Sequence, residues 1–145
     1  MQMPMMNQTF LKSFFAVVII DQVSKFLVQD KLEVLYNNGV SFGFLGGNKT
    51  LLAVALVAVM IGVWYCCKQF WLKYPLLAGM LFGGGISNVL DRILYPGVRD
   101  WLSVPGMNIK NNLADWAIFI AIISILYLEL VKQRQEQDQK RHAKN

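Results

Sequence analysis

Nine acidic residues occur in this chain of 145 residues, and two of them stand where paired carboxylates could do chemistry. Asp100 follows a long apolar segment within Val98–Trp101, and Asp115 lies near the start of the next apolar segment within Asn112–Asp115. Two carboxyl groups at one partly desolvated site share a proton, because they cannot both ionise easily. Such a pair activates water through one carboxyl while the other protonates the reacting group.

The same two residues have a simpler interpretation as separate carboxylates at a membrane surface. In that case Asp115 caps the helix that follows it, where a negative charge near the amino end is favourable. Spacing in the sequence does not show that Asp100 and Asp115 meet, so both interpretations stay open at this point.

A second polar group, formed by Asp21, Ser24 and Lys25, lies inside an apolar segment. The three residues share one face of a helix, and Asp precedes Lys in the order that favours an ion pair. A charged side chain inside a membrane span costs about 2.5–3.5 kcal/mol on insertion scales. Pairing removes most of that cost, so we interpret Asp21 and Lys25 as a structural pair that holds helices together.

A third polar group lies further along the chain, where Asn88, Asp91 and Arg92 share a helix face after Gly83–Gly85. The glycines allow a neighbouring helix backbone to approach closely. One interpretation has Arg92 extending to the membrane surface with Asp91 as its partner. Asn88 lies deeper, and interfacial solvation does not explain it, so a functional role for this group is equally open.

The composition places these residues in a membrane protein. Hydrophobic residues make up 55% of the chain and charged residues 16%, against about 45–50% and roughly 25% in soluble domains. Leu51–Cys67 and Tyr74–Leu90 each run for 17 residues without a charge. As a helix, each rises about 25 Å, close to the roughly 30 Å hydrocarbon core of a bilayer. This pattern excludes a soluble globular enzyme, a disordered chain and a disulfide scaffold.

We expect an all-α integral membrane protein, a single membrane domain over residues 1–145 with four transmembrane helices. The spans cover about residues 8–29, 50–67, 74–94 and 112–131, and the polar tail at 132–145 is expected to be a fraying helix. Between the first two spans, apolar residues of Val34–Leu45 alternate around Asn38-Gly39, which is typical of a hairpin. We therefore expect a small extracytoplasmic β element between helices one and two.

Four spans place both termini on the same side of the membrane. Eight basic residues fall on the terminal side and five on the other side. Cytoplasmic segments are enriched in Lys and Arg, so we expect both termini in the cytoplasm. The longer connections, at about residues 30–49 and 95–111, then face outward, and Asp100 and Asp115 lie toward the extracytoplasmic face.

Several classes of ligand have no residues to support them. The one histidine, His142, lies in the charged tail, and Cys66 and Cys67 are adjacent, so no metal site and no histidine-based hydrolase is expected. The basic residues flank apolar segments instead of forming one stripe, which argues against nucleic-acid binding. We therefore expect no metal, no cofactor and no nucleic acid.

Five motifs, in the same order along the chain, are similar to those of the lipoprotein signal peptidases, the type II signal peptidases of bacteria. They are Asp21–Lys25 (D-Q-x-[ST]-K), Asn37–Phe42 (N-x-G-x-[AS]-F), Gly84–Arg92 (G-[GA]-x-G-N-x-x-D-R), Val98–Trp101 (V-x-D-F with its aromatic changed) and Asn112–Asp115 (the N-x-A-D of F-N-x-A-D). The motifs span most of the chain, so the resemblance is specific.

The resemblance implies an intramembrane aspartic endopeptidase with Asp100 and Asp115 as its catalytic pair. The implied substrate is a prolipoprotein whose cysteine carries a diacylglyceryl group, and cleavage just before that cysteine releases the signal peptide. The implied location is the bacterial cytoplasmic (inner) membrane, where we expect a multi-pass monomer in contact with lipid. The residues implied around the pair and the substrate are Asn37, Gly39, Asn88, Arg92 and Asn112, with Asp21 and Lys25 as structural supports.

Three residues depart from the motifs of that family. Ser87 replaces a glycine, Trp101 replaces a phenylalanine, and Asn111 stands where the family has phenylalanine. Both aspartates are kept, so we expect an active enzyme. Two other classes of function stay open: a small transporter that uses Asp21 and Asp115 as proton or cation sites, and a non-catalytic relative that binds lipoprotein signal peptides.

Overall fold

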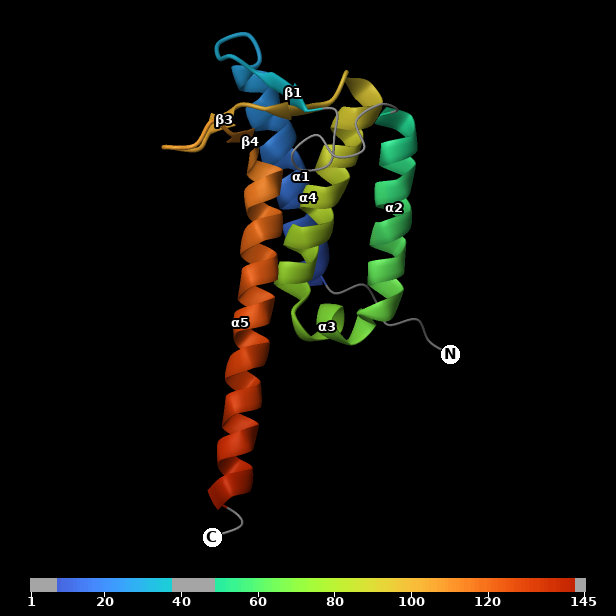
Figure 1. Ribbon diagram of the computed structural model, residues 1–145. Helices are drawn as coiled ribbons and strands as arrows, with labels where there is room; N and C mark the ends of the chain where they lie inside the picture. Colours follow the sequence, from blue (N-terminus) through green and yellow to red (C-terminus); the bar gives the residue numbers. More distant parts are fainter. Residues whose placement is uncertain (1–7, 38–48, 143–145) are drawn as a thin grey trace.

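The computed structural model describes residues 8–37 and 49–142, which form five helices and four short strands (Figure 1). The helices are α1 (Gln8–Val28), α2 (Lys49–Cys66), α3 (Lys68–Lys73), α4 (Pro75–Leu94) and α5 (Leu113–His142). The strands are β1 (Leu35–Asn37), β2 (Val98–Asp100), β3 (Leu102–Ser103) and β4 (Lys110–Asn111). The strands lie at one end of the helices, and α3 lies at the other end.

In addition to the helices predicted as spans, the described residues form a short helix, α3, in the connection between α2 and α4. The chain bends at Cys67, whose carbonyl accepts hydrogen bonds from the backbone N–H groups of Phe70 and Trp71. Pro75 then begins α4, in a position where its missing N–H leaves no intrahelical bond unmade. Trp71 of α3 is buried, and its ring packs edge-on against Phe82 of α4. Burial of this apolar side chain explains why the connection folds back onto the bundle.

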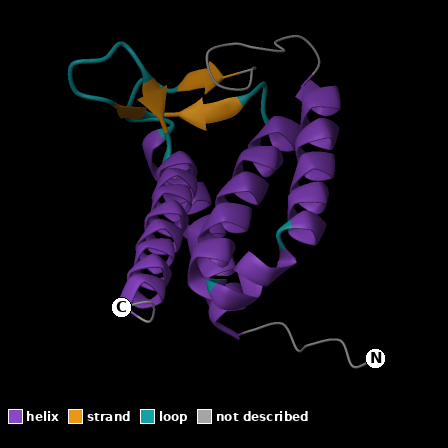
Figure 2. Cartoon of the chain, turned by 60° about the horizontal axis from the view of Figure 1, so that its bottom comes forward, coloured by secondary structure: helices purple, strands orange, loops and turns teal. Residues whose placement is uncertain are grey.

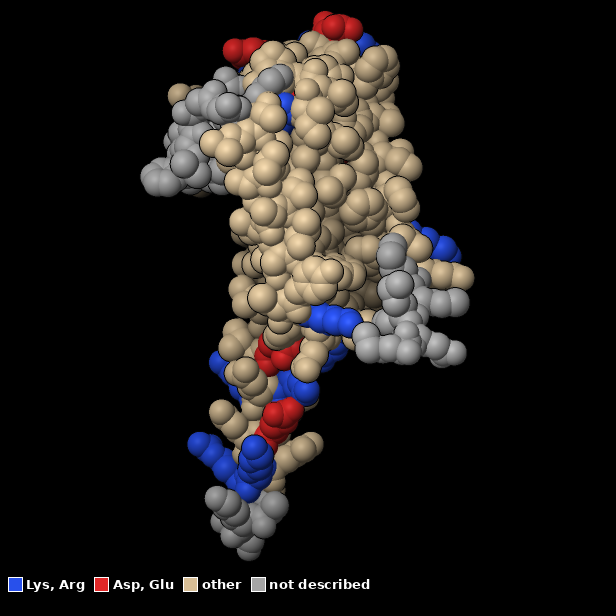
Figure 3. Space-filling model, turned by 90° about the vertical axis from the view of Figure 1, so that its right-hand side faces the viewer, with Lys and Arg blue, Asp and Glu red and all other residues tan. Residues whose placement is uncertain are grey.

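Each of the four predicted spans matches one helix (α1, α2, α4 or α5) except for one residue at one end, and α5 continues beyond its predicted span. Within the described ranges, α5 is the one helix long and apolar enough to cross a membrane, while Thr50–Cys66 is a shorter apolar helix. Helices α1 and α4 carry buried charged residues, which lower their hydropathy. The polar tail extends α5 as a regular helix to His142, and the charged residues on it stand apart from the mainly uncharged body in Figure 3.

Strand β1 of the predicted β element forms, and its partner among the described residues is a strand from a later connection. Strand β1 pairs antiparallel with β2, which lies in the connection between α4 and α5, and Leu35 stands opposite Asp100. The expected hairpin partner, residues 38–45, lies outside the described residues. Strands β3 and β4 form a second antiparallel pair, so both pairs gather at one end of the helices (Figure 2). A turn motif predicts pairing only between neighbouring segments, whereas the described partner of β1 lies far along the chain.

Helix α4 packs against α1, α2 and α5 and is therefore the central helix of the bundle. Its glycines make close approach possible: a Cβ atom at Gly83 would lie 2.6 Å from the Phe14 carbonyl oxygen of α1. A Cβ atom at Gly84 would lie 2.7 Å from the Ala114 carbonyl oxygen of α5. Small residues at such crossings bring helix backbones together in membrane proteins. This close packing also brings the polar residues at the strand end of α4 next to α1 and α5.

Candidate active site

Asp100 and Asp115 line one cavity at the strand end of the bundle. Asp100 is the last residue of β2, and Asp115 lies in the first turn of α5. The cavity has a volume of about 340 Å³, and Asn88 and Arg92 of α4 also contribute to its wall. The two residues therefore line the same cavity, which their spacing in the sequence did not show.

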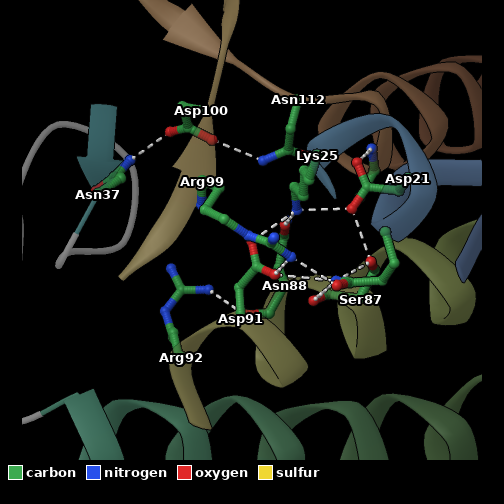
Figure 4. Close-up of polar contacts among 12 residues, drawn as sticks. Asp21, Lys25, Asn37, Ser87, Asn88, Asp91, Arg92, Arg99, Asp100 and Asn112 are labelled. Atoms are coloured by element: carbon green, nitrogen blue, oxygen red, sulfur yellow. Dashed lines mark hydrogen bonds and ion pairs between the residues drawn. The ribbon is translucent and has the colours of Figure 1, made fainter. Parts of the chain in front are cut away.

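The Asp100 carboxylate is held by two amide donors. Its Oδ1 accepts a hydrogen bond from Asn112 Nδ2 at 2.6 Å, and its Oδ2 accepts one from Asn37 Nδ2 at 3.2 Å. Figure 4 shows Asp100 between these two side chains. Only 2% of Asp100 is exposed. Burial raises the pKa of Asp100 to about 6, the Asn112 donor offsets part of this rise, and the nearby Asp115 charge adds to it.

The Asn112 side chain connects the two aspartates. Its Oδ1 accepts a hydrogen bond from the backbone N–H of Asp115 at 2.9 Å, so Asn112 is the N-cap residue of α5. Its Nδ2 is the donor to Asp100 described above. The Asp115 carboxylate in turn accepts a hydrogen bond through Oδ1 from Asn88 Nδ2 at 2.7 Å. One side-chain amide, that of Asn112, therefore both caps α5 and holds the Asp100 carboxylate, while Asn88 holds the Asp115 carboxylate.

Arg92 belongs to the cavity and not to the lipid-facing surface. It is 6% exposed, and its Nη1 donates a hydrogen bond to the Asn88 carbonyl oxygen at 3.0 Å. The interpretation of Arg92 as a residue extending to the membrane surface is therefore wrong, because its side chain is buried in the cavity wall. Asp91 is held instead by Lys25 and Arg99. Gly39, which was predicted to lie near the pair, falls outside the described residues.

Beside the cavity, four buried charged side chains form a network that joins α1, α4 and β2. Lys25 Nζ lies 2.6 Å from Asp21 Oδ2 and 3.0 Å from Asp91 Oδ2. Arg99 Nη2 lies 2.8 Å from Asp91 Oδ1. Two carboxylates and two basic groups balance in charge, which makes their burial tolerable. The Asp21 carboxylate also accepts the backbone N–H of Ala114, so the network reaches α5 as well.

Three residues that belong to this network or hydrogen-bond to it were not identified from the sequence as polar partners. Arg99 was counted only as a basic loop residue, and nothing in the sequence marks it as buried. Gln22 donates to Asp91 Oδ1 and accepts from Arg99 Nη2, yet a glutamine beside an apolar stretch is a weak signal. Ser87 was noted only as a departure from a motif; its buried hydroxyl donates to Asp21 Oδ2 at 2.7 Å. The hydroxyl therefore adds a link between α4 and α1.

The other two departures from the family motifs lie in and beside the second strand pair. The backbone N–H of Trp101 donates to the Asn111 carbonyl oxygen at 3.0 Å. The Asn111 side chain accepts a hydrogen bond from the Trp116 indole N–H at 3.1 Å. Asn111 thus has a polar partner in the first turn of α5. The presence of asparagine where the family has phenylalanine is therefore compatible with the fold.

The rest of the cavity wall is apolar and lies between α2, α4 and α5. Helix α2 contributes Leu56, Val59, Met60 and Val63, helix α4 contributes Leu81, Phe82 and Gly85, and helix α5 contributes Ile118. Polar groups gather at the strand end and apolar side chains line the remainder. Such a cavity suits a substrate with a reactive polar bond and an apolar portion. Among the described residues, no group of three potential ligands is arranged to hold a metal ion.

Comparison with known proteins shows to which family the chain belongs. The sequence model of the family described as signal peptidase (SPase) II matches residues 13–131. This chain belongs to the signal peptidase II family. The matched region contains Asp21, Asp100 and Asp115, and it covers most of the chain.

Relatives of this family align over nearly their full length. A lipoprotein signal peptidase from Campylobacter jejuni subsp. doylei is 33% identical over 147 residues, covering 89% of this chain and 92% of that protein. A lipoprotein signal peptidase from Fusobacterium nucleatum subsp. nucleatum is 30% identical over 144 residues, covering 85% and 87%. The fold is similar to that of a bacterial membrane enzyme solved by the in meso method at 2.3 Å resolution. The TM-score is 0.74 at 23% identity, with 89% and 91% of the chains covered.

Proposed function

We propose that Asp100 and Asp115 are the catalytic pair with which this protein cleaves the signal peptides of prolipoproteins. As a member of the signal peptidase II family, the chain is an aspartic peptidase and a lipoprotein signal peptidase. The observation that supports the assignment is the cavity that the two aspartates line together. The Asn112 side chain hydrogen-bonds the Asp100 carboxylate and the backbone N–H of Asp115. Paired carboxyl groups in a partly desolvated site are the chemistry that peptide hydrolysis requires.

In the proposed mechanism, the two carboxyl groups have different roles. Asp100 is the ionised member, since both of its oxygens accept amide hydrogen bonds, and it removes a proton from the attacking water. The water oxygen bonds to the carbonyl carbon while Asp115 donates its proton to the carbonyl oxygen. The C–N bond of the resulting diol then breaks as the proton held by Asp100 passes to the departing nitrogen. One hydroxyl proton of the diol returns to Asp115, which leaves the new carboxylic acid and restores both aspartates to their starting states.

The substrate class follows from the family and is supported by the two-part cavity. We propose a prolipoprotein whose cysteine already carries a diacylglyceryl group, cleaved just before that cysteine. The carboxylates would act on the peptide bond, and the apolar wall of α2 and α4 would contact apolar parts of the substrate. The requirement for the lipid is tested by comparing a modified with an unmodified prolipoprotein.

We further propose that the four predicted spans cross the bacterial cytoplasmic membrane with both termini in the cytoplasm. The ends of the described chain, at α1 and α5, lie on the side of α3, and the strands lie on the opposite side (Figure 1). The excess of Lys and Arg on the terminal side supports this orientation. The cavity would then open toward the extracytoplasmic face, and we expect the protein to act as a monomer.

The deciding experiment is cleavage of a diacylglyceryl-modified prolipoprotein by the purified protein and by Asp100→Asn and Asp115→Asn. Each substitution keeps the size of the side chain and removes a carboxyl group, so we expect cleavage to fall about 10³-fold or more. Asp30→Asn, an identical change at an exposed position, is the matched control and should retain activity. Substantial activity in either catalytic variant would contradict the assignment. Substrate binding without cleavage by the wild type would favour the non-catalytic alternative.

A further inference from the structure

We infer that Arg99 is a positioning residue for the reaction: it anchors strand β2 to the helices and thereby places Asp100 in the cavity. The inference rests on the proposed function, because it gives Asp100 a catalytic role. Arg99 occupies the variable position of the V-x-D motif, so the family motif assigns it no role.

Arg99 is among the most deeply buried charged residues of the described chain, with 1% of it exposed. Its Nη2 donates to Asp91 Oδ1 at 2.8 Å and to Gln22 Oε1 at 2.7 Å. Its Nη1 donates to Gln29 Oε1 at 3.3 Å, and the guanidinium carbon lies 3.8 Å from the centre of the Tyr95 ring. The side chain therefore contacts α1 through Gln22, the residue that follows α1, α4 through Asp91, and the segment that follows α4.

The backbone of Arg99 is held by the same carboxylate as its side chain. The Arg99 N–H donates to Asp91 Oδ2 at 2.9 Å, while the guanidinium occupies Asp91 Oδ1. The two oxygens of the buried Asp91 carboxylate thus bind Arg99 at two points. Two contacts restrict the orientation of Arg99 relative to Asp91 as well as the distance between them. Figure 4 shows Arg99 extending from β2 toward Asp91, with Asp100 next to it on the strand.

Strand β2 needs such an anchor because its own pairing is short. It consists of three residues and pairs with the three residues of β1. An isolated two-stranded pair of this size is marginally stable in water. Successive side chains of a strand point to opposite sides, so Arg99 reaches into the helices while Asp100 faces the cavity. An anchor one residue before the carboxylate limits the movement of that carboxylate.

A lysine at this position would keep the charge but lose the anchor. An ammonium group is a point charge, whereas the planar guanidinium holds Asp91, Gln22 and Gln29 from fixed directions. The charge itself balances the network of Asp21, Lys25 and Asp91. Arg99→Lys therefore separates the contribution of charge from that of the anchor. It retains the charge balance and removes the hydrogen bonds that the guanidinium makes from fixed directions.

The test compares Arg99→Lys and Arg99→Met with the wild type in steady-state cleavage of a diacylglyceryl-modified prolipoprotein, below the Tm of every protein. We expect kcat to fall about 10- to 100-fold in both variants, because a displacement near 1 Å at a reacting group costs this much. KM should change by no more than about threefold, since the apolar wall that contacts substrate is unchanged. We expect the Tm to fall strongly in Arg99→Met and only slightly in Arg99→Lys.

Ser87→Gly is the matched control, because Ser87 belongs to the same network and does not contact β2. We expect its Tm to fall while kcat stays within about twofold of the wild type. A kcat of Arg99→Lys within that range would overturn the inference and leave Arg99 with a stabilising role only. If Arg99→Met fails to fold, Arg99→Lys alone decides. Failure of the proposed function is distinguishable, because the wild type would then not cleave or Asp100→Asn would remain active.

Discussion

Asn112 shows how much one side chain contributes at the residue scale. Its side-chain oxygen Oδ1 caps α5, and its side-chain nitrogen Nδ2 donates to Asp100. Loss of the oxygen would remove the helix cap, whereas loss of the nitrogen would remove a hydrogen bond to the carboxylate. The donor stabilises the ionised form of Asp100 and opposes the effect of burial on its pKa. The carboxylate is available as a base only above about pH 6, and cleavage should therefore decline as the pH falls through this value.

Asn112→Asp tests this account, because aspartate keeps the cap but cannot donate as a carboxylate. A second negative charge beside Asp100 raises its pKa further, so the acid limb of kcat/KM should move to higher pH by about one unit or more. The measurement is a pH–rate profile, with the Tm recorded to show that the cap is retained. Asn108→Asp adds the same charge at an exposed position and should leave the limb in place. An unchanged limb in Asn112→Asp would contradict the role of the donor.

At the element scale, the packing of α4 decides whether the polar residues meet. Gly83 and Gly84 lie in consecutive positions and face different neighbours, α1 and α5. Both crossings are close enough that a side chain would have to displace a backbone carbonyl. The packing of α4 therefore sets the distance from Asn88 to its partners, Lys25 on α1 and Asp115 on α5.

Gly83→Ala is expected to destabilise the protein by about 1–3 kcal/mol, the usual cost of overpacking. The added Cβ would lie 2.6 Å from the Phe14 carbonyl oxygen, and backbone atoms cannot move away cheaply. Gly62→Ala in α2 is the control, since a Cβ atom there meets nothing within 4 Å. Alanine favours a helix over glycine by about 0.5–1 kcal/mol, so the control should be neutral or stabilising. Thermal unfolding in detergent measures both, and equal Tm shifts would contradict the packing argument.

At the scale of the whole molecule, the buried network joins four elements that are distant in the chain. Lys25 of α1 binds Asp21 and Asp91, Arg99 brings in β2, and Asp21 accepts the N–H of Ala114 in α5. Two negative and two positive groups balance inside the protein. Such a network stabilises poorly in comparison with apolar packing, but removing one member is costly.

Lys25→Met is expected to destabilise the protein by about 3–5 kcal/mol, because it leaves two carboxylates with one basic partner. Combining Lys25→Met with Asp21→Asn restores the balance of charge and should recover part of the lost Tm. The measurement is thermal unfolding of both variants in detergent, together with their yield from the membrane. A double variant less stable than Lys25→Met alone would show that charge balance is not the main contribution of Lys25.

The sequence by itself determined the four long helices and the candidate carboxylates. Long uncharged stretches predict helices whatever their neighbours, and few acids lie near them, so Asp100 and Asp115 were identifiable. The tertiary structure decided which side chains meet. Asn37 reaches Asp100 across 63 positions and Arg99 reaches Gln22 across 77, distances over which no local pattern carries information. The close packing of α4 creates these contacts, because only assembled helices bring polar groups from α1, α4 and the strands within hydrogen-bonding distance.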